Sequence, residues 1–593
     1  MKEERTLRSL RRRSLAVGPL RGYGLWLSVL VVVTYLVIAL QQATQPYTID
    51  EATFPYGAEG ILKHGAPYFY NGETRPMDLG LWHPPLYIYS LAVHMMAFGS
   101  SHVSVRLFGI LAVLVAFVVG LLTLRKIAPE ACQAVYVAFA ALLLLNPLVL
   151  SSALVPDIDG TVGICAVMLL LWLAMRLIAE TPSRNLLVAT IAVWALTVSA
   201  KFTLALLFIP LLLAAALLSR STRITKVGIV VAGIITGSTV FVAGWFALSR
   251  LAGFPARAPV DYFISGMQRT SSSSGALRSV MVHLQPSTGV LFWIGPGLLA
   301  IALVSSVLSL AGRLPFVRKS SLAFLFVTGV YLIVAYAAIT GSPFGFPKYW
   351  IAAIPALALV GSLPVEQVWR AFGPLVKTAN DRVGPWILLL TGSLVFLAPL
   401  SIAYVYLSNT MRTGVRDLAG LTYVTAGAWL AYFLVLSAFC WLRVRLPLFR
   451  VLSVVGAVAI AALFFGVVSS QLALDLANRS ADYSTRYYFG ERGLGDTIAY
   501  LQREMPRDAY LFAAKDIGLQ SGRRFFEDAA FFYQSPEALE AFLRDGPIRF
   551  LVTREKWDYS EPVFPQHFAV IGKYFAPVPN QPSPDFTVWK RKE

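Results

Sequence analysis

Acidic and basic side chains of this chain gather in the short segments that separate its apolar stretches. The acidic pair Asp50 and Glu51 directly follows the first apolar run, and Asp157 and Asp159 lie in the connection VPDIDGT. Lys201 stands in VSAKFT, where two further apolar runs meet. A carboxylate can accept the proton of an attacking hydroxyl or amine, and a cation can neutralise a phosphate. Together these residue types indicate transfer of a group from a lipid phosphate.

Two other segments supply further cations. The turn GSPFGFPKYW carries Lys348 and Tyr349, and the long connection 249–287 carries Arg269 and Arg278 among several basic residues. Lys and Arg neutralise the charge of a phosphate, and the guanidinium also matches its geometry. Taken singly, each arginine of this connection is more readily explained as a surface charge than as a ligand.

Simpler roles remain open for the other candidates. Asp50 and Glu51 could be solvated charges at the end of a span, and one aspartate of PDIDG could cap a helix. Lys201 could extend its ammonium to the lipid interface. His83 could form a metal site with Glu51 or Asp50, but these residues alone make a weak metal motif.

The composition excludes a soluble enzyme. Of the 593 residues, 57% are hydrophobic and 14% are charged, well below the roughly 25% charged residues of soluble domains. The net charge is +18, and residues 1–474 hold 34 Lys and Arg against 15 Asp and Glu. This excess fits anchoring to lipid headgroups, because no soluble basic domain is present that could bind nucleic acid.

Apolar runs of about 20 residues predict a polytopic α-helical membrane protein with about 13 transmembrane helices. The expected spans lie near 24–40, 103–124, 131–150, 161–179, 186–200, 203–218, 227–248, 288–311, 321–340, 350–366, 385–407, 420–442 and 451–474. Segment 83–99 has a shorter apolar run that contains His83 and His94. We expect it to form a helix at the membrane interface rather than a span.

Charge predicts the orientation. Lys and Arg recur in every second connection, which the positive-inside rule assigns to the cytoplasm. Residues 1–23 then form a basic cytoplasmic N-terminus, 24–474 form the membrane domain, and loop 42–102 lies on the outer side. An odd number of spans places 475–593 outside as well. We therefore expect a multi-pass protein of the plasma (inner) membrane with an extracytoplasmic, periplasmic C-terminal domain.

The tail 475–593 has the pattern of a small α/β domain. Residues 493–505 and 535–546 are expected to be helical, with Ser535 as a cap before Pro536. Short apolar runs at 509–514, 549–553, 568–574 and 586–589 predict strands. No nucleotide-binding loop, metal cluster or nucleophile motif is present in this tail, so we expect a supporting role for it.

The order and spacing of several motifs resemble a known family. They are the pair Asp50 and Glu51, AEGILKHGAPYFYNG at 58–72, HPPLY at 83–87 and FGSSHVSVRLFGIL at 98–111. The chain resembles the lipid-linked-sugar glycosyltransferases of the GT-C class, specifically the protein-mannosyltransferase and aminoarabinose-transferase group. Aminoarabinose transferases have an acidic-basic pair before Pro-Pro, where this chain has Trp82 and His83. The departure favours a generic member over one that modifies lipid A.

The resemblance implies roles by position. Asp50 corresponds to the family's first-loop aspartate, which activates or orients the acceptor, with Glu51 beside it. Asp159 fits the second acidic site better than Asp157, which stays open. Residues expected to hold the donor phosphate are Lys201, Lys348, Tyr349 and either Arg269 or Arg278. Residues expected to shape the substrate loop are Tyr56, His83, Tyr87 and Arg106.

We therefore expect an enzyme that moves a hexosyl or pentosyl group from a polyprenyl-phosphate donor to an acceptor at the outer face of the membrane. The acceptor could be a lipid, a glycan or a protein, and the other partners are membrane lipids. No cofactor is required by the pattern, and a divalent metal is left open. The alternative is a transporter or flippase of a lipid-linked saccharide, which should show internal repeats and charges near the bilayer midplane. Charges at one face and the lack of a clear repeat favour the enzyme.

Overall fold

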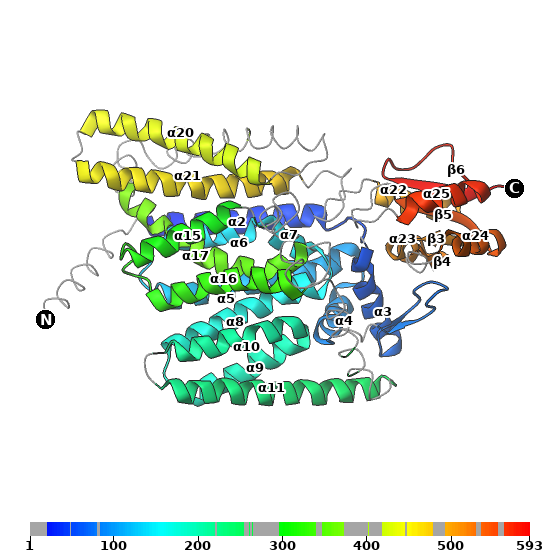
Figure 1. Cartoon of the computed structure of the whole chain (residues 1–593), viewed down its shortest axis with the longest axis horizontal. Helices are drawn as coiled ribbons and strands as arrows, with labels where there is room; N and C mark the ends of the chain where they lie inside the picture. The colour runs from blue at the N-terminus through cyan, green and yellow to red at the C-terminus, as the bar shows by residue number, and fades with distance from the viewer. Residues whose placement is uncertain are drawn as a thin grey trace.

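The computed structural model (Figure 1) consists of a long helical bundle with a small α/β domain at one end. The described residues are 20–47, 49–79, 84–219, 222–253, 296–339, 347–372, 418–444, 448–477, 493–528, 535–554 and 563–593, with single positions 260, 264, 294 and 401. We call the end of the bundle that faces the α/β domain the domain end.

The bundle helices run lengthwise beside one another in Figure 1. They are α2 (Leu20–Gln42), α5 (His102–Ile127), α6 (Gln133–Leu144), α7 (Pro147–Leu154), α8 (Gly163–Ala179), α9 (Arg184–Ala200), α10 (Phe202–Leu217), α11 (Arg223–Leu251), α15 (Pro296–Leu310), α16 (Lys319–Ile339), α17 (Ile354–Ser362), α20 (Leu418–Val444) and α21 (Leu448–Ala477). The polytopic helical fold predicted from the sequence is thereby confirmed.

Seven of the described helices are long and apolar enough to cross a membrane, and the bent pair α6 and α7 would make an eighth. Shorter apolar helices, among them α9 and α10, coincide with further predicted spans. The predicted span 385–407 lies outside the described residues. The total of about 13 therefore stays a prediction.

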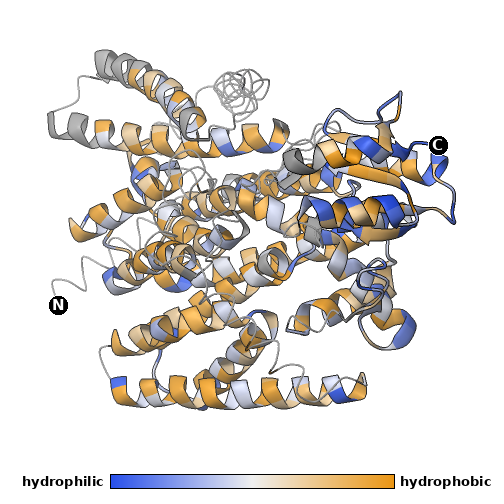
Figure 2. Cartoon of the chain, turned by 45° about the vertical axis from the view of Figure 1, so that its right-hand side comes forward, coloured by the Kyte–Doolittle hydropathy of each residue, from blue (hydrophilic) through white to orange (hydrophobic). Residues whose placement is uncertain are grey.

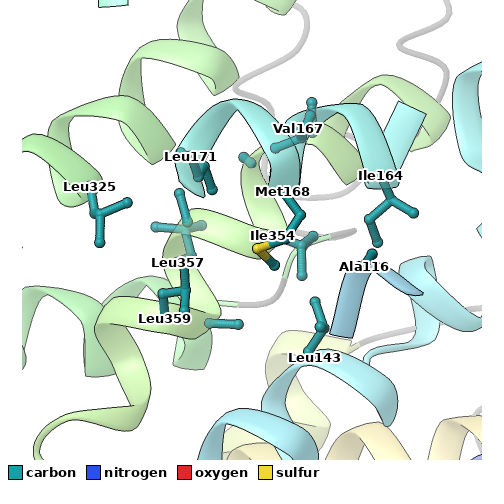
Figure 3. Close-up of a cluster of buried hydrophobic side chains, with 14 of the residues drawn as sticks. Ala116, Leu143, Ile164, Val167, Met168, Leu171, Leu325, Ile354, Leu357 and Leu359 are labelled. Carbon is teal, nitrogen blue, oxygen red and sulfur yellow. The ribbon is translucent and has the colours of Figure 1, made fainter. Parts of the chain in front are cut away.

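Burial separates a central helix from peripheral ones. The stretch Tyr349–Phe372 is 89% buried in its apolar window, whereas the windows in Gly24–Gln42 and Arg223–Leu251 are 17% and 22% buried. Figure 3 shows the core, where Leu357 of α17 lies near Met168 of α8. Figure 2 shows apolar residues along the bundle and most hydrophilic residues at the α/β domain. The outer surface of the bundle is thus apolar enough to face lipid.

Loop 42–102 folds over the domain end. It contains η1 (Ile49–Ala52), α3 (Thr53–His64), the two-stranded hairpin β1 (Tyr68–Phe69) and β2 (Asp78–Leu79), and α4 (Leu86–Phe98). Helix α4 has 13 residues, about 20 Å of helix, which is too short for the roughly 30 Å hydrocarbon core. It is the shortest of the shorter apolar helices in the described part of the chain, and the expectation that 83–99 does not span stays a prediction.

The C-terminal domain is a five-stranded sheet in the order β4-β3-β5-β7-β6. Strands β4, β3 and β5 are parallel, and β7 and β6 continue antiparallel. Its elements are α22 (Leu494–Glu504), β3 (Tyr510–Ala513), α23 (Lys515–Ser521), β4 (Arg524–Glu527), α24 (Pro536–Asp545), β5 (Ile548–Arg554), α25 (Val563–Tyr574), β6 (Phe575–Pro577) and β7 (Phe586–Arg591).

Most predicted elements of this domain are confirmed, but the strand predicted at 568–574 is wrong. These residues form the second half of helix α25. Val570 and Ile571 are buried side by side in it, which is a helical pattern, because a half-buried strand buries alternate residues. Helix α25 packs on α24, and a short apolar run alone does not distinguish such a helix from a strand.

Candidate functional site

Three short, irregular helices lie at the domain end and carry five of the thirteen predicted site residues. They are the 3₁₀-helix η1, the π-helix η2 (Ile158–Val162) and the 3₁₀-helix η3 (Pro347–Ala353). Helix η2 contacts η3, and α7 contacts both. Segments of π-helix are rare and occur often at functional sites. The bundle thus interrupts its regular helices where the predicted chemistry is located.

Arg106, near the start of α5, joins two of the segments that lead to the carboxylates. Its guanidinium donates to the carbonyl oxygens of Leu154 through Nε (3.0 Å), Ala43 through Nη1 (2.8 Å) and Pro46 through Nη2 (3.0 Å), and also to that of Gln45. Residues 43–46 lead into η1, and Leu154 ends α7 just before η2. One buried side chain therefore fixes both segments relative to α5.

The same guanidinium lies against Glu51. Nη2 of Arg106 is 3.7 Å from Oε2 of Glu51, and the Glu51 side chain is 5% exposed. Glu51 is therefore not a solvated charge, which the sequence had left open for the acidic pair. The backbone of Asp50 lies beside it in η1, and the side chain of Asp50 is outside the described part.

Tyr87 of α4 lies near two acidic residues, Asp157 and Glu51. Burial raises the pKa of Tyr87 well above its ordinary value, and the nearby charges of Asp157 and Glu51 raise it further, whereas a hydrogen bond with Thr161 lowers it. Asp157 is 5% exposed. The phenol of Tyr87 is thus a neutral hydrogen-bonding group placed among two acidic residues.

Close packing on α7 determines the position of η2. The hydroxyl of Thr161 donates to the carbonyls of Ser152 (3.3 Å) and Val155 (3.2 Å). A Cβ at Gly160 would lie 2.9 Å from Cα and the carbonyl oxygen of Ser152, so only glycine fits there without a shift. The backbone of Asp159 stands directly before this glycine, and the side chain of Asp159 is outside the described part.

Lys201 forms the cationic part of the site. It occupies the single extended residue between α9 and α10, with φ −159° and ψ 118°. Its Nζ lies 4.8 Å from the ring centre of Tyr349 and 5.5 Å from that of Tyr336. The two rings stack with centres 5.8 Å apart and planes 12° apart. An ammonium over aromatic faces is stabilised by cation–π attraction.

Sequence reasoning singled out Lys201 and Tyr349 together, and the structure brings them together. It missed Tyr336, because one tyrosine within an apolar run is not distinguishable from a core or interface residue. Tyr349 belongs to η3, which contacts η2. Lys201 is therefore linked to the acidic segment η2 through Tyr349.

The structure does not describe four of the remaining predicted side chains. His83, Arg269 and Arg278 lie outside the described residues, as does the side chain of Lys348. Within the described part of the chain, no three His, Cys, Asp or Glu side chains are grouped to hold a metal ion.

Tyr56 faces the C-terminal domain. Its hydroxyl donates to the carbonyl of Leu519 at 3.1 Å. Burial, aided by the charge of Glu59, raises the pKa of Tyr56 to about 12. The phenol therefore stays protonated, and Tyr56 connects the loop to the domain.

Three comparisons with known proteins bear on this arrangement. The family model described as dolichyl-phosphate-mannose-protein mannosyltransferase matches residues 82–245, from the start of the Pro-Pro motif into α11. The crystal structure of ArnT from Cupriavidus metallidurans bound to undecaprenyl phosphate is similar with a TM-score of 0.54 and 14% identity, covering 95% of this chain and 97% of that one. Its apo structure gives the same TM-score and coverage with 16% identity.

A comparison with curated proteins gave no match. The two ArnT structures are too distant in sequence to show more than the fold, but that fold extends over nearly the whole chain. The resemblance to the GT-C class of lipid-linked-sugar glycosyltransferases, predicted from the sequence, is confirmed by the family model and by the shared fold.

Proposed function

We propose that this protein is a glycosyltransferase that moves a sugar from a polyprenyl-phosphate donor to an acceptor at the outer face of the membrane. The single observation that carries the proposal is that Lys201 lies over the ring of Tyr349 in η3, the element that contacts the acidic segment η2 at one end of an apolar bundle. A lipid-linked phosphate would reach this end from the bilayer. ArnT, which has the same fold, has been crystallised with undecaprenyl phosphate.

The proposed reaction uses the acidic residues of the site on the acceptor and its cationic residues on the donor. The acceptor hydroxyl or amine attacks the anomeric carbon of the sugar, and its proton passes to the carboxylate of Asp50. The bond between the anomeric carbon and the phosphate oxygen breaks, and the polyprenyl phosphate leaves with the electron pair. Glu51, held by Arg106, and the second acidic residue, Asp159 or Asp157, would orient the acceptor and stabilise the positive charge that develops on the sugar ring.

The residues that bind the donor must balance the charge of the leaving phosphate. Lys201 supplies the ammonium, and the hydroxyl of Tyr349 supplies a hydrogen-bond donor. Lys348 and one of Arg269 and Arg278 would complete the phosphate site. His83 and Tyr87 lie on the segment that would line the acceptor side. Addition of a chelator to the assay below tests for a divalent metal near His83 and Glu51.

The test is transfer by the purified full-length protein in proteoliposomes, with a panel of polyprenyl-phosphate hexoses and pentoses as donors and with lipids, glycans and peptides as acceptors. We expect release of free polyprenyl phosphate from one donor, and a fall of about 10²–10⁴-fold in this rate for Asp50→Asn. Lys63→Ala is a matched control, because Lys63 lies in the same loop with a side chain 65% exposed. If every donor crossed the bilayer intact without release of polyprenyl phosphate, the protein would be a flippase.

A further inference from the structure

We propose that Gln520, in the C-terminal domain, is a positioning residue for the carboxylates of η1, an inference that rests on the proposed function. The backbone N–H of Tyr47 donates to Oε1 of Gln520 at 2.8 Å, and Nε2 of Gln520 donates to the carbonyl of Tyr47 at 2.6 Å. Nε2 also donates to the carbonyl of Asp516, in its own helix, at 2.9 Å. The amide is thus fixed in α23 and holds both backbone groups of one residue in loop 42–102.

The position of Tyr47 gives this contact its consequence. Tyr47 lies two residues before η1, which carries Asp50 and Glu51. The ring of Tyr47 stands 5.1 Å from the guanidinium of Arg106, whose hydrogen bonds hold residues 43–46. Gln520 therefore holds from the domain side the same short segment that Arg106 holds from the bundle side.

Helix α23 as a whole covers η1. The two helices are in contact, and α23 begins directly after the carboxyl end of β3. The acidic segment η1 therefore packs against a helix that follows the carboxyl end of a parallel strand. The C-terminal domain thus contributes to the geometry of the site, beyond the supporting role that its motif-free sequence predicted.

A second, separate attachment keeps the domain docked. The backbone N–H of Glu73 donates to the carbonyl of Phe525 at 2.7 Å, and Arg524 pairs with Glu73 at 2.8 Å. Gly72 has φ 86°, and a Cβ there would lie 2.9 Å from the carbonyl oxygen of Phe525. Since this contact does not involve Gln520, a change at Gln520 should shift η1 without releasing the domain.

The experiment compares Gln520→Ala with Gln581→Ala in the transfer assay. Gln581 is the matched control, because its amide makes the same kind of paired backbone hydrogen bonds with Val578 and Val588, entirely within the β6–β7 hairpin. We expect Gln520→Ala to lower kcat by about 10–100-fold, since a small misplacement of a catalytic group has costs of that size. The donor KM should stay within about two-fold, because Lys201 is not touched, and Gln581→Ala should keep the wild-type kcat.

Gln520→Glu supplies a readout that loss of folding would not produce. A carboxylate can accept from the N–H of Tyr47 but cannot donate to its carbonyl, whereas a protonated carboxyl group can do both. The ratio of the Gln520→Glu rate to the wild-type rate should therefore rise as pH falls towards the ordinary glutamate pKa of about 4.3.

A Gln520→Ala kcat within two-fold of wild type, or an equal fall in Gln581→Ala, would overturn the proposal. So would a Gln520→Glu ratio that does not depend on pH. If the wild-type protein used no lipid-linked donor at all, the proposed function would fail, and hydrogen–deuterium exchange would decide the positioning by itself. Faster exchange at residues 47–52 in Gln520→Ala, but not in Gln581→Ala, would support it, and unchanged exchange would overturn it.

Discussion

Replacement of Arg106 tests whether one buried side chain holds both acidic segments. Arg106 is 1% exposed, donates to four backbone carbonyls and lies 3.7 Å from Glu51. Each such hydrogen bond contributes about 0.5–1.5 kcal/mol net, and removing one member of a buried ion pair typically costs about 3–5 kcal/mol. Because these contributions overlap, we expect Arg106→Met to lower the free energy of unfolding by about 4–5 kcal/mol.

Two further variants separate charge from geometry. Arg106→Lys keeps a cation near Glu51 but has a single nitrogen, which cannot reach the carbonyl of Leu154 and those of residues 43–46 at once. We expect it to cost about 2–3 kcal/mol, less than the methionine variant. The double variant with Glu51→Gln should lose less stability than the two single variants lose together. The difference, which is the coupling energy, should be about 1–3 kcal/mol.

The measurement is unfolding of the purified protein in mixed micelles, followed by tryptophan fluorescence. Arg250→Met is the control, because Arg250 is an exposed arginine at the end of α11. An Arg106→Met protein within about 1 kcal/mol of wild type would refute the clamp, since that is the scale of an ordinary surface substitution. A lysine variant as unstable as the methionine variant would refute the contribution of charge.

The remaining predictions concern the donor, the topology and the C-terminal domain. Tyr336→Leu should raise the donor KM about as much as Tyr349→Leu, roughly 5–30-fold for a loss of about 1–2 kcal/mol, and an unchanged KM would remove Tyr336 from the donor site. Single cysteines are placed at Ile224, which is 90% exposed, and at the exposed Arg549 of β5, in a cysteine-free background. They should label from opposite sides of the membrane, with Arg549→Cys outside. Labelling of both from one side would contradict the proposed topology. Hydrogen bonds from Lys573 and Tyr574 lower the pKa of Glu540. Their stabilisation of the α24–α25 contact is therefore present above the unfolded pKa of about 4.3 and is lost on acidification. Glu540→Gln should flatten the fall in melting temperature between about pH 5 and 3.

The lengths of the apolar runs made the helical bundle predictable, but they did not predict breaks within single spans. The predicted span 131–150 is two helices, α6 and α7, bent by 57°. The signal was present at the break, because Asn146 caps α7 and Pro147 stands at its first position. Hydropathy averages over such a break, since every residue around it is apolar.

The predictable part of the site was the type of its residues. Charge in an apolar context identified Lys201, Glu51 and Asp157, which the structure places at one end of the bundle. The partners were not predictable. Gln520 reaches Tyr47 across 473 residues of sequence, and a glutamine on a polar helix carries no local signal of such a contact.

The contacts that shape the site are therefore of a different kind from the groups that would do the chemistry. Arg106 and Gln520 act on backbone carbonyls and N–H groups of the segment before η1. The carboxylates of η1 depend on these contacts for position, because a four-residue 3₁₀-helix has too few hydrogen bonds to hold itself. A related chain that keeps the acidic pair but lacks either contact should bind its donor through the Lys201 site and transfer the sugar slowly. The presence of the acidic pair alone then predicts the reaction, and the two backbone contacts predict its rate.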